Sequence, residues 1–149
     1  IPTRLLFSFT QRIYMSNEKK IMSRDEILAT LKGMNVAKVE VLYSGGHDEG
    51  GVDQIDLFDA DGKKIRSMEE YYGGTMVWDE ATKGWKPAEA PTDEQRLSQA
   101  LCVPVYDKYC SFAGDFYVNG TITWDVENRR VRNHGTEEIS QDDSFDDYI

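Results

Sequence analysis

Residues 36–58, VAKVEVLYSGGHDEGGVDQIDLF, determine the fold expected for this chain. Apolar and polar residues alternate on both sides of a glycine-rich centre, which is the pattern of strands that bury one face. On the first strand the apolar face consists of Val39, Val41 and Tyr43. We therefore predict that residues 36–43 and 52–58 form an antiparallel pair of strands joined by a loop.

The loop between these strands carries the most distinctive residues of the sequence. Four glycines surround one of the two histidines and a pair of acids. Glycine at that density suits a backbone that adopts positive φ or lets another group approach closely. We predict an ordered loop at an edge of the sheet and treat it as a candidate binding site. Its residues are Tyr43, Gly45, Gly46, His47, Asp48, Glu49 and Gly50.

Elements on either side of this pair complete the predicted fold. Capping boxes that begin at Ser23 and Thr92 open two helices, because the N-cap side chain and the one three residues later satisfy each other's backbone amides. The first helix is predicted over 24–33, and Pro104 is expected to kink the second or break it in two. Further strands are predicted at 63–66, 76–78, 116–126 and 130–132. This order predicts an α+β fold, an antiparallel sheet with two helices packed on one face.

Charge divides the chain into three segments. Residues 1–14 contain two arginines and no acid, and Met15 has the context of a natural start, so 1–14 is expected to be a leader or a cloning-derived segment. A mitochondrial presequence is the alternative. Residues 135–149 contain six acids and neither lysine nor arginine; such a block repels itself, and we predict an acidic disordered tail. Residues 15–134 are predicted to form a single domain.

The net charge of the chain limits its partners. A formal charge of −10 and a pI near 4.6 argue against direct binding to nucleic acid or to an anionic membrane, since both require clustered lysine and arginine. No stretch approaches the roughly 20 apolar residues of a membrane span. Cys102 and Cys110 are separated by about 12 Å of helical rise, too far for a disulfide. We expect reduced thiols in a cytoplasmic protein.

Candidate chemistry is centred on the glycine-rich loop. The sequence contains no complete catalytic or cofactor motif, and we expect no cofactor. A phosphate-binding loop is disfavoured because no Lys-Ser/Thr follows the glycines and the acids would repel phosphate. If the last strand ends beside the loop, His47, Asp48 and His134 form a set suited to a divalent metal. The alternative is a loop held by ordinary hydrogen bonds. The aromatic residues are expected mainly in the core, with a recognition surface as the alternative; they are Trp78, Trp85, Trp124, Tyr71, Tyr72, Phe116 and Tyr117.

Two stretches resemble a family of small proteins of unknown function from bacteria and their phages or plasmids. In that family a strand ends in a Tyr-x-Gly-x-x-Asp-x-Gly loop, and a later Gly-Thr strand leads to a closing histidine. The matching positions are Tyr43, Gly45, Asp48 and Gly50 for the first motif, and Asp115, Gly120, Thr121, Asp125 and His134 for the second. The family's Asn-Asp-Gly-Gly run does not occur in this sequence. The resemblance implies an origin in bacteria or mobile elements, with no activity attached.

These observations lead to three hypotheses about function. The first is a small acidic, non-enzymatic protein that binds a protein with a basic surface, as an accessory or inhibitory factor of a phage or plasmid. Its acids would imitate nucleic-acid phosphates. The second is a metal-dependent hydrolase, and the third is a virion or structural component. In the first hypothesis the tail adds binding residues to those of the loop, namely Asp142, Asp143, Asp146 and Asp147. The oligomeric state is left open.

Overall fold

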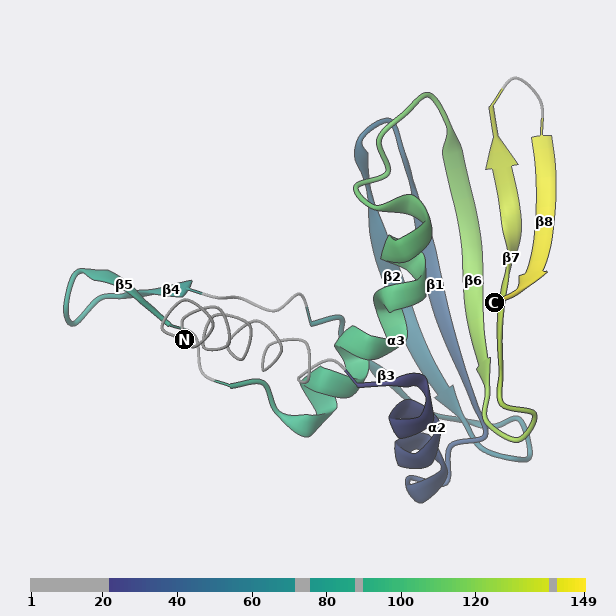
Figure 1. The fold of residues 1–149 in the computed structure, drawn as a ribbon, viewed down its shortest axis with the longest axis horizontal. Coiled ribbons are helices and arrows are strands. Elements are labelled where there is room, and N and C mark those ends of the chain that lie inside the picture. Colours follow the sequence, from purple (N-terminus) through teal and green to yellow (C-terminus); the bar gives the residue numbers. More distant parts are fainter. Residues whose placement is uncertain (1–21, 72–75, 88–89, 140–141) are drawn as a thin grey trace, which may run out of the picture.

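The computed structural model describes residues 22–71, 76–87, 90–139 and 142–149, so the predicted leader, residues 1–14, lies outside the described residues. The chain forms the helices and strands shown in Figure 1. They are α2 (Arg24–Gly33), β1 (Lys38–Gly46), β2 (Glu49–Phe58), β3 (Lys64–Met68), β4 (Met76–Asp79), β5 (Gly84–Pro87), α3 (Asp93–Tyr109), β6 (Tyr117–Asp125), β7 (Arg130–Glu138) and β8 (Asp142–Tyr148).

Within the described ranges, the main sheet has six strands in the order β3-β2-β1-β6-β7-β8. Every neighbouring pair is antiparallel. Helices α2 and α3 lie against one face, the inner face, and no described element covers the opposite, outer face (Figure 1). The predicted α+β fold, an antiparallel sheet with two helices packed on one face, is confirmed for this part of the chain.

The order of elements repeats within the main sheet. A helix followed by three antiparallel strands occurs first as α2-β1-β2-β3 and again as α3-β6-β7-β8. The first strands of the two units, β1 and β6, pair at the centre of the sheet, from Lys38 opposite Asp125 to Gly46 opposite Tyr117. The third strands, β3 and β8, form its two edges. The core is therefore shared between two similar halves.

Alternation along the strands places the apolar side chains on the inner face. Val39 lies between Leu57 on one side and Trp124 on the other, and all three are buried. The indole Nε1–H of Trp124 donates to the carbonyl of Leu101 in α3, at 3.2 Å. Removing such apolar surface from water stabilises the fold by about 25 cal/mol per Å². The helix residues that close the core are Ile27, Leu28, Leu31, Leu97, Leu101 and Val105.

Both helices begin where the capping residues predict. The side chains of Ser23 and Thr92 each accept a backbone N–H from three residues later. Helix α3 continues through Pro104, so of the two predicted outcomes, a kink or a break, the break does not occur. Leu101 and Val105, on either side of the proline, are fully buried, and this packing offsets the cost of a proline inside a helix, about 3 kcal/mol. Neither of these helices is long and apolar enough to cross a membrane, among the residues described.

The acidic C-terminal segment forms a hairpin. Strand β7 continues to Glu138, beyond the domain boundary predicted at 134, and β8 pairs with it from Asp142 to Tyr148. The prediction of a disordered tail over 135–149 is therefore wrong for the described residues. Residues 135–138 and 142–148 of this segment belong to the same sheet as the rest of the domain.

Contacts across the strands explain why this segment is ordered in spite of its charge. The guanidinium of Arg132 makes a two-point ion pair with the carboxylate of Asp146. Phe145 packs, partly buried, against the core, and Lys108 Nζ of α3 lies 4.0 Å from the centre of its ring. The disordered tail was predicted from the six acids alone, because Arg132 and Lys108, which contact this segment, lie outside it in the sequence.

Strands β4 and β5 form a separate hairpin that stands away from the main sheet (Figure 1). Trp78 lies opposite Trp85, with ring centres 5.5 Å apart and planes nearly perpendicular. Both are exposed, as is Tyr117. The prediction of core aromatics is therefore right for Trp124 and wrong for these three. For Trp78 and Trp85 the reason is that, among the described residues, no further strand or helix pairs with this two-stranded sheet; Tyr117 lies at the exposed start of β6.

Candidate functional site

The glycine-rich loop is much shorter than predicted. Strand β1 extends to Gly46 and β2 begins at Glu49, so only His47 and Asp48 form the turn. Their φ angles are 52° and 70°, and two successive residues with positive φ are the mark of a tight hairpin turn whose twist matches that of the strands. The turn joins two interior strands; it lies at an end of the sheet, not at an edge as predicted.

The tip of this turn is ordered because its backbone is bonded to the segment after α3. The N–H of His47 donates to the carbonyl of Gly114 at 3.2 Å, and the N–H of Asp48 donates to that of Phe112 at 3.0 Å. The side chains of His47 and Asp48 remain exposed. The prediction of an ordered loop is confirmed.

The glycines beside the turn serve packing. A Cβ on Gly45 would lie 2.4 Å from the ring of Phe112, and one on Gly50 would lie 2.7 Å from the same ring. Phe112 is fully buried. Gly46 has a φ of 151°, and a Cβ there would lie 1.9 Å from the carbonyl oxygen of Phe116. Gly45, Gly46 and Gly50 thus pack beneath a cluster that includes the rings of Tyr109, Phe112 and Phe116, and we call these three glycines the packed floor. Close packing alone explains why glycine occupies these positions, without a bound ligand.

Tyr43, predicted as a binding residue, belongs to that cluster. It is 1% exposed, its hydroxyl donates to Asn133 Oδ1 at 2.5 Å, and its ring lies over Gly120. Burial raises the pKa of the Tyr43 phenol. Burial, together with the hydrogen bond that Tyr109 donates to Glu137 at 2.6 Å, likewise raises the pKa of Tyr109. Both phenols stay neutral at physiological pH and act as structural hydrogen-bond donors.

The two histidines do not meet. His134 lies opposite Thr121, which lies opposite Leu42, and His47 follows Leu42 by five residues, roughly 15 Å along the strand. Among the described residues no group of three His, Cys, Asp or Glu side chains is placed to hold a metal ion. The alternative metal set of His47, Asp48 and His134 is therefore wrong, because the register of β6 and β7 separates its members.

Acidic residues from three segments gather at the end of the sheet that carries the turn. Gly46 lies opposite Tyr117, Tyr117 opposite Glu138, and Glu138 opposite Asp142, so the turn lies at the same end of the sheet as the end of β7 and the start of β8 (Figure 1). We call it the acidic end; its residues are Asp48, Glu49, Asp115, Glu137, Glu138, Asp142 and Asp143. Lys108 reaches it, with Nζ 3.8 Å from Glu137 Oε1.

The β7–β8 register sets like charges against each other at the acidic end. Glu138 lies opposite Asp142, and Glu137 opposite Asp143. Like charges directly across two strands destabilise a sheet. At the other end of the sheet the charges are mixed and paired. The ion pairs there are Lys38–Glu40 at 3.1 Å, Lys64–Asp56 at 3.0 Å and Arg129–Asp25 at 2.6 Å.

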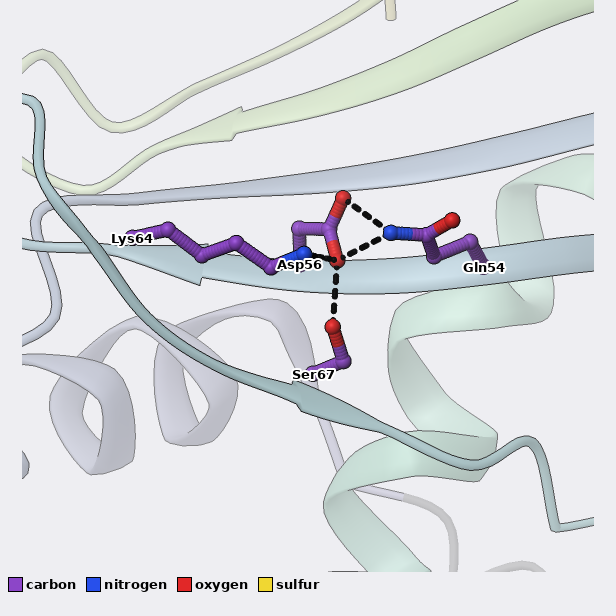
Figure 2. A network of polar contacts seen from close by, with 4 residues as sticks. All are labelled: Gln54, Asp56, Lys64 and Ser67. Carbon is purple, nitrogen blue, oxygen red and sulfur yellow. Dashed lines mark hydrogen bonds and ion pairs between the residues drawn. The ribbon is translucent and has the colours of Figure 1, made fainter.

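On the outer face, Asp56 is a buried carboxylate whose partners account for it (Figure 2). Ser67 Oγ donates to it at 2.6 Å, Gln54 Nε2 donates to both oxygens, and Lys64 Nζ lies 3.0 Å away. Burial acts to raise the pKa of Asp56, but the bonds from Ser67, Gln54 and Lys64 together outweigh it and leave the pKa below its usual value. The carboxylate is satisfied and serves to tie β3 to β2.

The structure sorts the predicted binding residues into two groups. The first group is buried packing: Tyr43 belongs to the aromatic cluster, and Gly45, Gly46 and Gly50 form the packed floor beneath it. The second group lies at the acidic end and consists of His47, Asp48, Glu49, Asp142 and Asp143. Asp146 is paired with Arg132, and Asp147 lies beside it on β8. Asp115, Glu137 and Glu138 also lie at the acidic end but were not predicted as binding residues. A signal was present: the acidic pairs 137–138 and 142–143 flank a short segment, as expected for a hairpin.

A cavity of about 560 Å³ lies at the mixed-charge end and shares no residue with the acidic end. Its apolar lining includes Leu28, Val36, Ala60 and Val126. No protein-family model matches the chain, and neither curated proteins nor solved structures give a significant match. The resemblance to small bacterial and phage proteins stays a prediction, and functional inference rests on geometry and charge.

Proposed function

We propose that this is a non-enzymatic protein that uses its acidic end to bind a protein with a basic surface, as an inhibitory or accessory factor of phage or plasmid type. The observation that carries the proposal is the placing of acids from the β1–β2 turn, the segment before β6 and the β7–β8 hairpin at one end of the sheet. These segments are far apart in sequence, so a local run of charge does not explain their convergence.

The cost of this arrangement supports a role in binding. Neighbours of like charge across two strands lower stability, and the register sets Glu138 opposite Asp142 and Glu137 opposite Asp143. Lys108 lies 3.8 Å from Glu137, but among the described residues no ion pair involves Glu138. A basic partner would add countercharge at this end. Concentrated negative charge also speeds the approach of a basic protein, an effect that is screened beyond about 8 Å at physiological ionic strength.

A basic surface that accepts this end is also one that binds nucleic-acid phosphates. The protein is therefore expected to compete with nucleic acid for its partner. The direct test measures the displacement of a fluorescent DNA duplex from a panel of basic DNA-binding proteins, by anisotropy, at low and at physiological salt. We expect displacement from at least one member, with an affinity that falls steeply as salt rises.

Two triple variants separate a specific surface from net charge. The acidic-end triple is Asp48→Asn, Glu49→Gln and Glu138→Gln; the control triple is Asp61→Asn, Glu69→Gln and Glu127→Gln. All six side chains are exposed, and each triple removes the same charge. The acidic-end triple should lose displacement through a slower association rate, and the control should retain it. Equal loss in both triples, or no displacement from any panel member, would contradict the proposal.

A further inference from the structure

The two edges of the main sheet differ in how they are protected. Strand β3 is short and carries Lys64 and Arg66, and short strands with basic side chains are common means of blocking an edge. Strand β8 contains no lysine, arginine or proline, and it pairs with β7 over its whole length without a shift in register. Within the described part of the chain nothing pairs with its other side. A long, regular edge is thus left open.

One hydrogen bond fixes which backbone groups of β8 face outward. The N–H of Ile149 donates to the carbonyl of Val131 at 2.9 Å, and these two residues are opposite each other when the register is continued by one position from Arg132 and Tyr148. Hydrogen-bonded and non-bonded pairs alternate in an antiparallel ladder. The alternate positions therefore direct N–H and C=O away from β7; they are Asp142, Ser144, Asp146 and Tyr148.

The charge of β8 determines what can pair with this edge. A second copy of the strand would bring two sets of four aspartates together, and like charges across strands repel. An extended segment rich in lysine and arginine meets opposite charge on both faces, because each face of β8 has two aspartate positions, of which only Asp146 is paired, with Arg132, in the ion pairs described above. Phe145, on the inner face, adds an apolar contact.

We propose that the open edge of β8 accepts an extended basic segment of the partner as an added strand. The inference rests on the proposed function, since it names how the basic partner is held. Main-chain hydrogen bonds to the four outward positions provide affinity, and the aspartates provide selectivity for basic sequences. The charge on β8 thus blocks self-association and admits one class of strand.

Ser144→Pro tests the geometry without changing charge. Ser144 is exposed and its N–H points outward, so proline removes a donor from the open edge and none from the β7–β8 ladder. Ser144→Ala is the matched control. The probe is a synthetic peptide that alternates lysine with valine or threonine and is long enough to span β8, together with the same peptide N-methylated at alternate residues. Binding is measured by calorimetry at low salt.

The expected result is tight binding of the unmodified peptide to the wild type and to Ser144→Ala. The affinity of the unmodified peptide should be lower by about tenfold or more for Ser144→Pro than for the wild type. The affinity of the N-methylated peptide for the wild type should be lower by a similar factor. The comparison of the two peptides uses the wild-type protein alone, so it tests strand addition even if proline at position 144 disturbs β8. If both peptides bind equally and the acidic-end triple weakens both, strand addition is overturned and the proposed function stands. If neither peptide binds the wild type, strand addition is overturned, and the displacement assay alone decides whether the proposed function stands.

Discussion

The glycines beside the β1–β2 turn are held in place by what packs on them. Gly45 and Gly50 are opposite each other, and the ring of Phe112 covers both. The stacked ring of Tyr109 lies 5.4 Å from that of Phe112, so the cluster has little freedom to withdraw. Gly51 differs, because a Cβ there would meet only the end of the Tyr106 side chain, at 3.3 Å.

This difference gives a prediction within one hairpin. Gly45→Ala and Gly50→Ala should each lower the free energy of unfolding by about 1 to 3 kcal/mol, the usual cost of overpacking a core. Gly51→Ala should be close to neutral. Urea unfolding at constant m-value measures all three. Equal stability of the three variants would show that Phe112 does not sit on this floor.

Asp56 gives a prediction about pH. Its bonds to Ser67, Gln54 and Lys64 lower the carboxyl pKa in the fold, below the value of about 3.9 in an unfolded chain. The stabilisation is therefore fully present above about pH 4 and is lost as pH falls through the lower folded pKa. Asp56→Asn should cost about 1 to 2 kcal/mol at pH 7.

The same variant should differ less from the wild type once the carboxyl is protonated. Unfolding free energies measured from pH 7 to pH 2.5 check this, with Glu69→Gln as an exposed control that leaves the pH profile unchanged. A constant difference between wild type and Asp56→Asn at every pH would mean that the charge of Asp56 is not what the network stabilises.

At the scale of elements, order in β8 comes from pairing with β7. The alternation of bonded and outward amides predicts alternating protection from hydrogen exchange. Amides of Asp143, Phe145 and Asp147 should exchange slowly, and those of Ser144, Asp146 and Tyr148 quickly. Residue-resolved exchange by NMR measures this pattern. Uniformly fast exchange from 142 to 148 would restore the disordered tail that composition favours.

The hairpin β4–β5 is a separate sheet among the described residues, and its two tryptophan rings lie against each other. We therefore expect it to contribute little to the stability of the main sheet. Trp85 is 67% exposed, whereas Trp124 is 3% exposed. Trp85→Ala should change the global free energy of unfolding by less than about 0.5 kcal/mol, and Trp124→Ala should lower it by about 3 to 5 kcal/mol. Far-ultraviolet circular dichroism in denaturant compares them. A large loss for Trp85→Ala would place the hairpin against the body of the domain.

Local patterns in the sequence were sufficient for most of these elements. The period of two around Val41 and Ile55, and the capping residues Ser23 and Thr92, predicted the fold class and the first helix. Patterns that depend on distant partners were misread. The order of β8 depends on Arg132 and Lys108, and the continuity of α3 at Pro104 depends on packing against the sheet.

The candidate site, too, was predicted from the sequence only where its residues are neighbours in the chain. Asp48 and Glu49 were predicted from the turn itself, but Asp115 and Glu138 join them only through strand register. A shift of register would take Glu138 away from Tyr117 and from the turn. Likewise, the metal set with His134 failed because the sequence does not give the positions at which strands pair.

At the scale of the whole molecule, a chain of net charge −10 brings the seven acids of the acidic end close together, and mutual repulsion is expected there. Raising ionic strength from about 10 mM to 150 mM shortens the screening length from about 30 to 8 Å and should raise the melting temperature. The acidic-end triple should melt higher than the wild type at low salt and gain less from added salt, whereas the control triple should gain as the wild type does. Thermal melts across a sodium chloride series measure this. A salt response unaffected by the acidic-end triple would mean that repulsion is spread over the whole surface.

The repeated order of a helix and three strands has a consequence for how such a chain could arise. One unit alone would expose its first strand, β1 or β6, as an edge with an apolar face, and two identical units would protect each other by pairing there. Fusion of two ancestral copies into one gene makes that dimer permanent. The segment that joins the copies then has only to span the distance between β3 and α3, and it is free to lengthen. The hairpin β4–β5 lies in that segment, where an insertion disturbs neither half.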